Sequence, residues 1–182
     1  MSNREDFEKD RGPREVSGRG TSGELRGVEA PIRPCLWFHD NAEEAMKFYV
    51  ELFPDSHIDG IERYPDESLD EHYKGMSGKV INGRFTLNGV QFVCLDGGPS
   101  FTFNEAVSFT VACADQAEID RYWQALSAVP EAEQCGWCKD RYGVSWQILP
   151  ANLGELMTGP AAIQALMGMH KIVIGDLQAA GA

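Results

Sequence analysis

An internal duplication is the feature that most constrains how this chain can fold. Six positions recur 74 residues later, where Asn41, Glu44, Lys47, Phe48, Tyr49 and Leu52 correspond to Asp115, Glu118, Arg121, Tyr122, Trp123 and Leu126. A turn and strand recur 54 residues later, where Gly89, Val90 and Phe92 correspond to Gly143, Val144 and Trp146. The second offset is smaller because the first copy carries a long insertion, residues 65–78. Capping residues, aromatic pairs and turn glycines in one order predict a duplicated βαβββ unit.

The elements of such a unit can be placed in both copies. In the first, residues 34–38 predict a strand, a capping box from Asn41 to Glu44 begins a helix, and residues 58–64, 79–87 and 90–95 predict three more strands. In the second, residues 107–113 predict a strand, and Asp115 with Glu118 begins a helix. A short strand is expected around residues 131–134, followed by a β-hairpin over 135–150.

The duplication predicts an α+β fold in which tandem βαβββ modules form two curved mixed sheets around a cleft. A single unit leaves one sheet face uncovered, so two units must pair. The first module spans residues 32–98 and the second spans 99–150. Residues 1–31 are too polar to form a core and are expected to be a disordered N-terminal tail. Residues 151–182 form a C-terminal helical segment that packs on the domain or on a dimer partner.

Charge and hydropathy exclude several classes of partner. The net charge of −12 argues against binding to a nucleic-acid backbone, which needs a basic patch. No run of about 18 apolar residues is present to span a membrane. The charged first 12 residues lack the apolar core of a signal peptide. We therefore expect a cytoplasmic protein.

The chain has five cysteines, and only one pair of them has a spacing typical of a redox or metal-binding role. Cys135 and Cys138 form a C-x-x-C pair, which is typical of redox chemistry or of half a zinc site. No second such pair follows, and this pair precedes a strand instead of opening a helix. We interpret the two cysteines as packing residues and expect no cofactor.

Several segments carry a family pattern, namely residues 36–38 (LWF), 41–45 (NAEEA), 48–49 (FY), 103–106 (FNEA), 119–123 (IDRYW), 135–137 (CGW) and 146–147 (WQ). They resemble the vicinal oxygen chelate superfamily, which has the glyoxalase and bleomycin-resistance fold and includes dioxygenases. Within it, they resemble the PhnB-like branch, also described as 3-demethylubiquinone-9 3-methyltransferase-like. The resemblance covers about residues 33–178. It implies the paired-module fold, a small-molecule ligand in the cleft, and a homodimer.

Metalloenzymes of this superfamily place His and Glu ligands on the first and last strand of each module. The resemblance puts Pro34, Val93, Ser108 and Gln147 at those four positions. Proline and valine offer no side-chain ligand, and serine and glutamine offer only neutral oxygens. The four histidines are scattered, and no two lie four residues apart. We therefore expect no metal at these positions.

Strand alternation predicts which residues line the cleft. If Gln147 faces the cleft, the residues that share its orientation are Ser145, Ser108, Thr110 and Gln91. Asn104 and Glu105 precede the fifth strand and form either a linker turn or the edge of the cleft. Trp146 and Phe92 point the other way and are expected in the core. No catalytic residue can be assigned.

Two functions from different classes remain. The first is a metal-free protein that binds a small, partly apolar molecule in the cleft between the modules. The second is a metal-dependent enzyme of this superfamily, a lyase, an isomerase or a dioxygenase-like relative. The missing ligand set favours the first. Methyl transfer finds no support, because a nucleotide methyl donor normally binds at a glycine-rich strand-to-helix turn and Gly97-Gly98 leads into Pro99.

Overall fold

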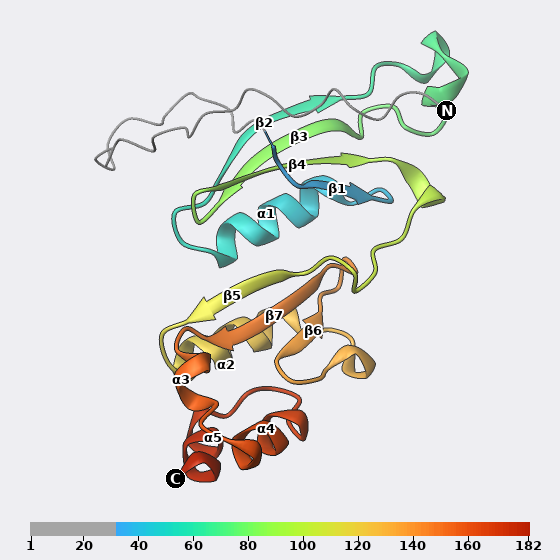
Figure 1. The fold of residues 1–182 in the computed structure, drawn as a ribbon. Helices are drawn as coiled ribbons and strands as arrows, with labels where there is room; N and C mark the ends of the chain where they lie inside the picture. The colour runs from blue at the N-terminus through green and yellow to red at the C-terminus, as the bar shows by residue number, and fades with distance from the viewer. Residues whose placement is uncertain (1–31) are drawn as a thin grey trace, which may run out of the picture. The chain divides into compact units, whose positions relative to one another are not determined.

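A computed structural model describes residues 32–182 of the chain, and the predicted tail, residues 1–31, lies outside the described residues. The first module contains β1 (Cys35–Phe38), α1 (Ala42–Leu52), β2 (His57–Arg63), β3 (Val80–Leu87) and β4 (Val90–Asp96). The second contains β5 (Phe109–Cys113), α2 (Gln116–Leu126), β6 (Trp137–Lys139) and β7 (Ser145–Pro150). Three helices follow, α3 (Leu153–Leu156), α4 (Pro160–Met167) and α5 (Ile174–Gly181) (Figure 1).

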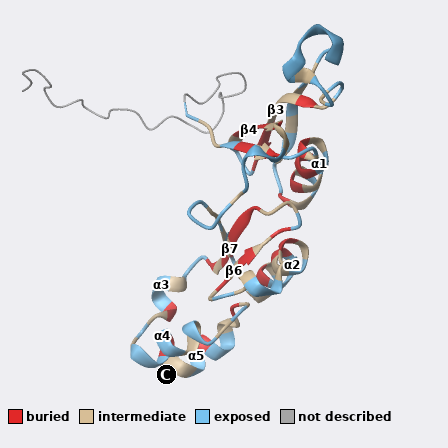
Figure 2. Cartoon of the chain, turned by 90° about the vertical axis from the view of Figure 1, so that its right-hand side faces the viewer, coloured by how far each residue is buried: buried red, intermediate tan, exposed pale blue. Residues whose placement is uncertain are grey.

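The two sheets have related topologies, as the duplication predicts. The first sheet has the strand order β1-β4-β3-β2, and the second has the order β5-β7-β6. The first strand of each module is parallel to the last, β1 to β4 and β5 to β7, and the remaining pairs are antiparallel. Each sheet carries its own helix, α1 or α2, on one face (Figures 1 and 2). The predicted α+β fold with two mixed sheets is confirmed.

The second sheet has three strands, so the expected strand around residues 131–134 is wrong. Pro130–Ala132 is instead a 3₁₀ turn, and Gln134 forms only an isolated bridge with Trp137. Proline fixes φ and has no N–H for a strand ladder, which explains why this segment turns. The second module is therefore βαββ.

Strand register shows that the two copies differ by one residue between the first strand and the helix. Phe38 pairs with Asp96 in the first sheet, and Cys113 pairs with Pro150 in the second. The helices keep the offset of 74, from Ala42 to Gln116, whereas the strands are related by 75, from Phe38 to Cys113. The connection in the second copy is thus one residue shorter.

That difference changes how the two helices are capped. Asp115 accepts a hydrogen bond from the Glu118 amide at 2.9 Å, and Glu118 Oε2 accepts one from the Ala114 amide at 2.8 Å, as a capping box predicts. Asn41 makes no side-chain cap, so the predicted capping box at α1 is wrong. Buried Asp96 takes its place and accepts from the amides of Ala42 at 2.8 Å and Val80 at 2.9 Å.

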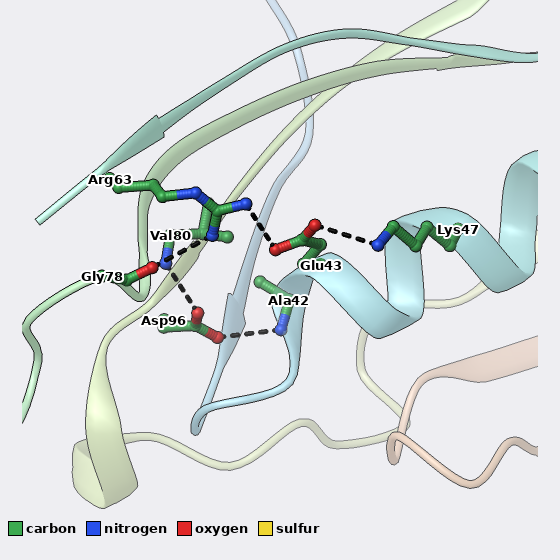
Figure 3. A network of polar contacts seen from close by, with 7 residues as sticks. All are labelled: Ala42, Glu43, Lys47, Arg63, Gly78, Val80 and Asp96. Atoms are coloured by element: carbon green, nitrogen blue, oxygen red, sulfur yellow. Dashed lines mark hydrogen bonds and ion pairs between the residues drawn. The ribbon is translucent and has the colours of Figure 1, made fainter.

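A more exposed set of ion pairs reinforces the same corner of the first module (Figure 3). Glu43 accepts from Lys47 at 3.0 Å and from Arg63 at 2.8 Å, and Arg63 also donates to the Gly78 carbonyl at 3.0 Å. Asp96 thus joins β4, α1 and β3, and Glu43 joins α1 to β2. The acidic segment between β2 and β3 contains two 3₁₀ turns, Glu67–Leu69 and Glu71–Tyr73.

One core is shared by both modules, and its buried residues lie on strands and helices of each (Figure 2). Tyr49 of α1 packs against Trp146 of β7, with ring centroids 5.5 Å apart. Phe92 and Trp146 are both buried, as their strand positions predict. The C-terminal segment adds a smaller cluster of Leu156, Ile172 and Leu177.

The C-terminal segment is attached to the second module through main-chain hydrogen bonds. The Cys135 and Gly136 amides donate to the carbonyls of Met169 and His170, each at 2.8 Å. Ile172 is fully buried. Within residues 32–182, no helix is both long and apolar enough to cross a membrane.

Candidate functional site

A cavity of about 400 Å³ lies where the two modules meet, along the outer edge of β5. That volume is in the range of small-molecule sites. The first module contributes the end of α1 and the β3–β4 turn, and the second contributes β5, α2 and β7. Its lining residues are Phe53, Pro54, Leu87, Asn88, Val90, Phe92, Phe109, Thr110, Val111, Ala112, Glu118, Tyr122 and Trp146.

Five of the thirteen lining residues are aromatic, and four of these, Phe53, Phe92, Tyr122 and Trp146, are buried. The Phe53 ring stacks on Tyr122 at a centroid distance of 5.1 Å and on Trp146 at 5.4 Å. Phe109 packs against Trp146 at 5.5 Å and edge-on against Phe92 at 5.2 Å. Phe53 directly follows α1, Tyr122 lies on α2, and the other three rings lie on strands of both sheets, so this wall forms only when both modules are folded. Such a wall favours an apolar or aromatic ligand.

The polar groups of the cavity are few and lie at three places. Thr110 comes from the edge strand β5, Asn88 from the β3–β4 turn, and Glu118 from the first turn of α2. Tyr122 lies one helical turn beyond Glu118, and burial raises the pKa of its phenol. The Tyr122 hydroxyl therefore remains a neutral hydrogen-bonding group at neutral pH.

The buried Asp140 carboxylate, which lies outside the cavity, fixes the position of Trp146, one of the residues that line it. Asp140 accepts hydrogen bonds from Tyr49 Oη at 2.7 Å, Trp146 Nε1 at 2.8 Å, and the amides of Tyr142 at 2.9 Å and Val144 at 3.0 Å. Burial raises the pKa of Asp140, and the four donors oppose that shift. Burial, together with the nearby Asp140 carboxylate, also raises the pKa of Tyr49. Asp140 thus links α1 of the first module to the hairpin of the second.

Of the five residues predicted to line the cleft, only Thr110 lines this cavity. Thr110 pairs with Gln147 across β5 and β7, and Gln147 Nε2 donates to Ser108 Oγ at 2.8 Å. These three residues therefore lie together on the helix-free face of the second sheet. Gln91 lies on the first sheet, between the cavity residues Val90 and Phe92.

Ser145 lies on the same face as Gln147 but is almost completely buried. Its hydroxyl has no hydrogen-bond partner within the described chain. Its strand neighbour Lys139 forms an ion pair with Glu105, which attaches the linker between the modules to β6. Asn104 accepts from the Ala106 amide at 3.0 Å and shapes a turn in that linker.

The positions that metalloenzymes of this fold use do not provide a metal-binding donor set. Ser108 and Gln147 are neutral and already hydrogen-bonded to each other. On the first sheet, Val93 pairs with Cys35, whose predecessor is Pro34. Elsewhere in residues 32–182, no three His, Cys, Asp or Glu side chains are grouped as metal ligands.

The cysteines are all unbridged thiols. Burial raises the pKa of Cys138 and of Cys94 to about 12, and that of Cys113 to about 11. These three are therefore protonated at neutral pH, which disfavours nucleophilic and metal-binding roles. Cys135 Sγ lies 3.7 Å from Met167 Sδ in the C-terminal segment and contacts Gln134 Nε2 at 3.2 Å.

Sequence reasoning missed most of the cavity wall. The hydrophobic pattern of the sequence assigns the aromatic residues Phe53, Phe109 and Tyr122 to the core. Phe53 follows α1, Phe109 begins β5, and Tyr122 lies on α2. The sequence predicts that Glu118 helps to cap the helix α2, and its hydrogen bond with the Ala114 amide agrees. The available signal was the repeat itself, because Tyr122 and Trp146 correspond to Phe48 and Phe92 of the first copy. Aromatic residues at repeated positions gather where the two copies meet.

Comparison with known proteins supports the fold and a family. The model of a family described as 3-demethylubiquinone-9 3-methyltransferase matches residues 30–149. A putative 3-demethylubiquinone-9 3-methyltransferase, PhnB protein, from Bacillus cereus is 40% identical; the match covers 66% of this chain and 99% of that chain, with a TM-score of 0.54. A protein from Staphylococcus aureus is 31% identical over 65% of this chain and 94% of that chain, with a TM-score of 0.29. A search of curated proteins gave no significant match.

Proposed function

The chain belongs to the PhnB-like, 3-demethylubiquinone-9 3-methyltransferase family, and we propose that it binds a small, mainly apolar molecule in the aromatic cavity without using a divalent metal. The observation that carries the proposal is the cavity of about 400 Å³ whose wall is built from both modules. Its aromatic and aliphatic walls suit an apolar body, and Thr110, Asn88 and Glu118 are available to orient a polar group.

Methyl transfer, which the family description names, is not the function we propose. A nucleotide methyl donor normally binds at a glycine-rich turn between a strand and a helix. The turns before the two α-helices of the modules, residues 39–41 and 114–115, contain no glycine, and Gly97 after β4 leads only into a three-residue 3₁₀ turn, Gly98–Ser100. A binding role needs only the cavity itself.

Titration calorimetry with 2-naphthylmethanol tests the proposal. We expect saturable 1:1 binding with a dissociation constant on the order of 100 µM, typical of a ligand of this size. Val90→Trp should weaken binding at least tenfold, because Val90 is half-exposed at the cavity and a larger ring there blocks entry. Val107→Trp is the matched control, since Val107 is also exposed but does not line the cavity.

Two results would contradict the proposal. The first is an absence of saturable binding to the unmodified chain, or equal binding by the Val90→Trp and Val107→Trp variants. The second is stoichiometric divalent metal in protein purified without chelator, which would favour the metal-dependent alternative instead.

A further inference from the structure

We propose that the cavity selects cationic ligands, namely amines or quaternary ammonium ions with an apolar body, and that Glu118 is the residue that selects them. The inference rests on the proposed function, because it names the class of molecule that this cavity takes. The first observation that supports it is the charge of the residues that line the cavity. Glu118 is the only one of them with a formal charge, and none of them is Lys, Arg or His.

The Glu118 carboxylate is held in place by a main-chain hydrogen bond and has no ion-pair partner among the described residues. Its Oε2 atom accepts from the Ala114 amide at 2.8 Å, which fixes the side chain at the first turn of α2. No Lys, Arg or His within residues 32–182 forms an ion pair with it. A half-buried carboxylate without a cationic partner, beside an apolar cavity, attracts a ligand cation.

The surroundings of Glu118 bear on the same ligand class. Tyr122 is four residues after Glu118, so the two side chains lie on one face of α2. The Arg121 guanidinium already lies 4.3 Å from the centroid of the Tyr122 ring, and Phe53 stacks on the same ring, so the attraction for a ligand cation rests on the Glu118 carboxylate. A carboxylate or phosphate ligand would instead be repelled by Glu118 and by a chain of net charge −12.

Three ligands with the same ring system but different charges distinguish the effect of ligand charge on binding from the effect of ligand shape. They are 2-naphthylmethylamine, which is a cation at pH 7, neutral 2-naphthylmethanol, and the anion 2-naphthoate. In titration calorimetry at low salt, we expect the amine to bind about tenfold more tightly than the alcohol. The naphthoate should bind at least tenfold more weakly than the alcohol. Salt should reduce these differences because it screens the charge of Glu118.

Glu118→Gln tests the residue itself. Glutamine keeps an oxygen for the Ala114 amide, so the helix cap is retained and only the charge is lost. We expect the amine and the alcohol to bind this variant within about twofold of each other. Glu155→Gln, which removes an exposed carboxylate on α3, is the matched control and should keep the tenfold preference.

The possible outcomes separate this inference from the proposed function. Equal binding of amine and alcohol to the unmodified chain, or tighter binding of naphthoate, would overturn the cation preference and leave the cavity as a ligand site. A preference that survives in Glu118→Gln would overturn the role of Glu118. Binding of none of the three compounds would overturn the proposed function itself.

Discussion

At the scale of single residues, buried carboxylates hold this fold together, and they differ sharply from the exposed ones. Asp140 satisfies four donors, and Asp96 satisfies two main-chain amides from different elements. Removing such an acceptor leaves buried donors without partners. The resulting loss of folding free energy exceeds the net contribution of the hydrogen bonds themselves.

Asp140→Ala is therefore expected to lower the free energy of unfolding by about 3–5 kcal/mol. Tyr49→Phe removes one donor and leaves the acceptor with three, so it should cost about 1 kcal/mol. Chemical denaturation of both variants measures these values. Asp40→Ala, at an exposed position, is the control and should change stability by less than about 0.5 kcal/mol. A loss at Asp140 no larger than that of the control would show that the Asp140 network is not required.

A second comparison concerns the start of α1. Asn41 precedes the helix but does not cap it, so Asn41→Ala should cost less than about 0.5 kcal/mol. Asp96→Ala should cost about 2–4 kcal/mol, because it leaves the buried Ala42 and Val80 amides without an acceptor. The reverse order in thermal or chemical denaturation would be inconsistent with this capping arrangement.

At the scale of elements, exposed ion pairs make a small, pH-dependent contribution to the free energy of unfolding. Hydrogen bonds from Lys47 and then Arg63 lower the pKa of Glu43 below its ordinary value of 4.5. The stabilisation is therefore fully present above about pH 4.5 and is lost as the pH falls through the lowered, folded-state pKa. All three side chains are at least 31% exposed, so the total is at most about 1 kcal/mol.

Glu43→Gln should accordingly destabilise the chain by less than about 1 kcal/mol at pH 7 and by nothing measurable below the folded-state pKa of Glu43. Denaturation of both proteins across pH 2.5–7 checks this. A difference that grows as the pH falls would have the wrong sign for a carboxylate with a lowered pKa.

The elements also show what the sequence could and could not predict. Offsets of 74 and 54 located both helices and most strands, because capping residues, aromatic pairs and turn glycines are local signals. The predicted strand around 131–134 was wrong because Pro130 turns the chain. The predicted cap at Asn41 was wrong because Asp96, 54 residues after Ala42, accepts the hydrogen bond from the Ala42 amide instead. Of the residues that line the cavity, the sequence predicted only Thr110, because the others lie far apart in sequence and each resembles an ordinary core or turn residue.

At the scale of the whole molecule, a homodimer stays a prediction. Ile163 and Met167 lie four residues apart on α4 and are 51% and 60% exposed, which leaves an apolar stripe on the C-terminal segment. We expect light scattering after size exclusion to give the mass of a dimer, and Met167→Glu to give that of a monomer. Thr158→Glu, at another position of the segment, is the control. A monomeric unmodified chain would contradict the prediction.

If the ligand binds in the cavity between the modules, three of the four tryptophans should respond to it differently. Trp146 lines the cavity, Trp137 pairs with Gln147 on the helix-free face of the second sheet, and Trp37 donates to the Gly98 carbonyl beside the first sheet. Titration of ¹⁵N-labelled protein with 2-naphthylmethanol, followed through the indole N–H signals, distinguishes these places. We expect a saturable shift of the Trp146 signal with little change at Trp137 and Trp37. A saturable shift at Trp137 or Trp37 with Trp146 unchanged would contradict it.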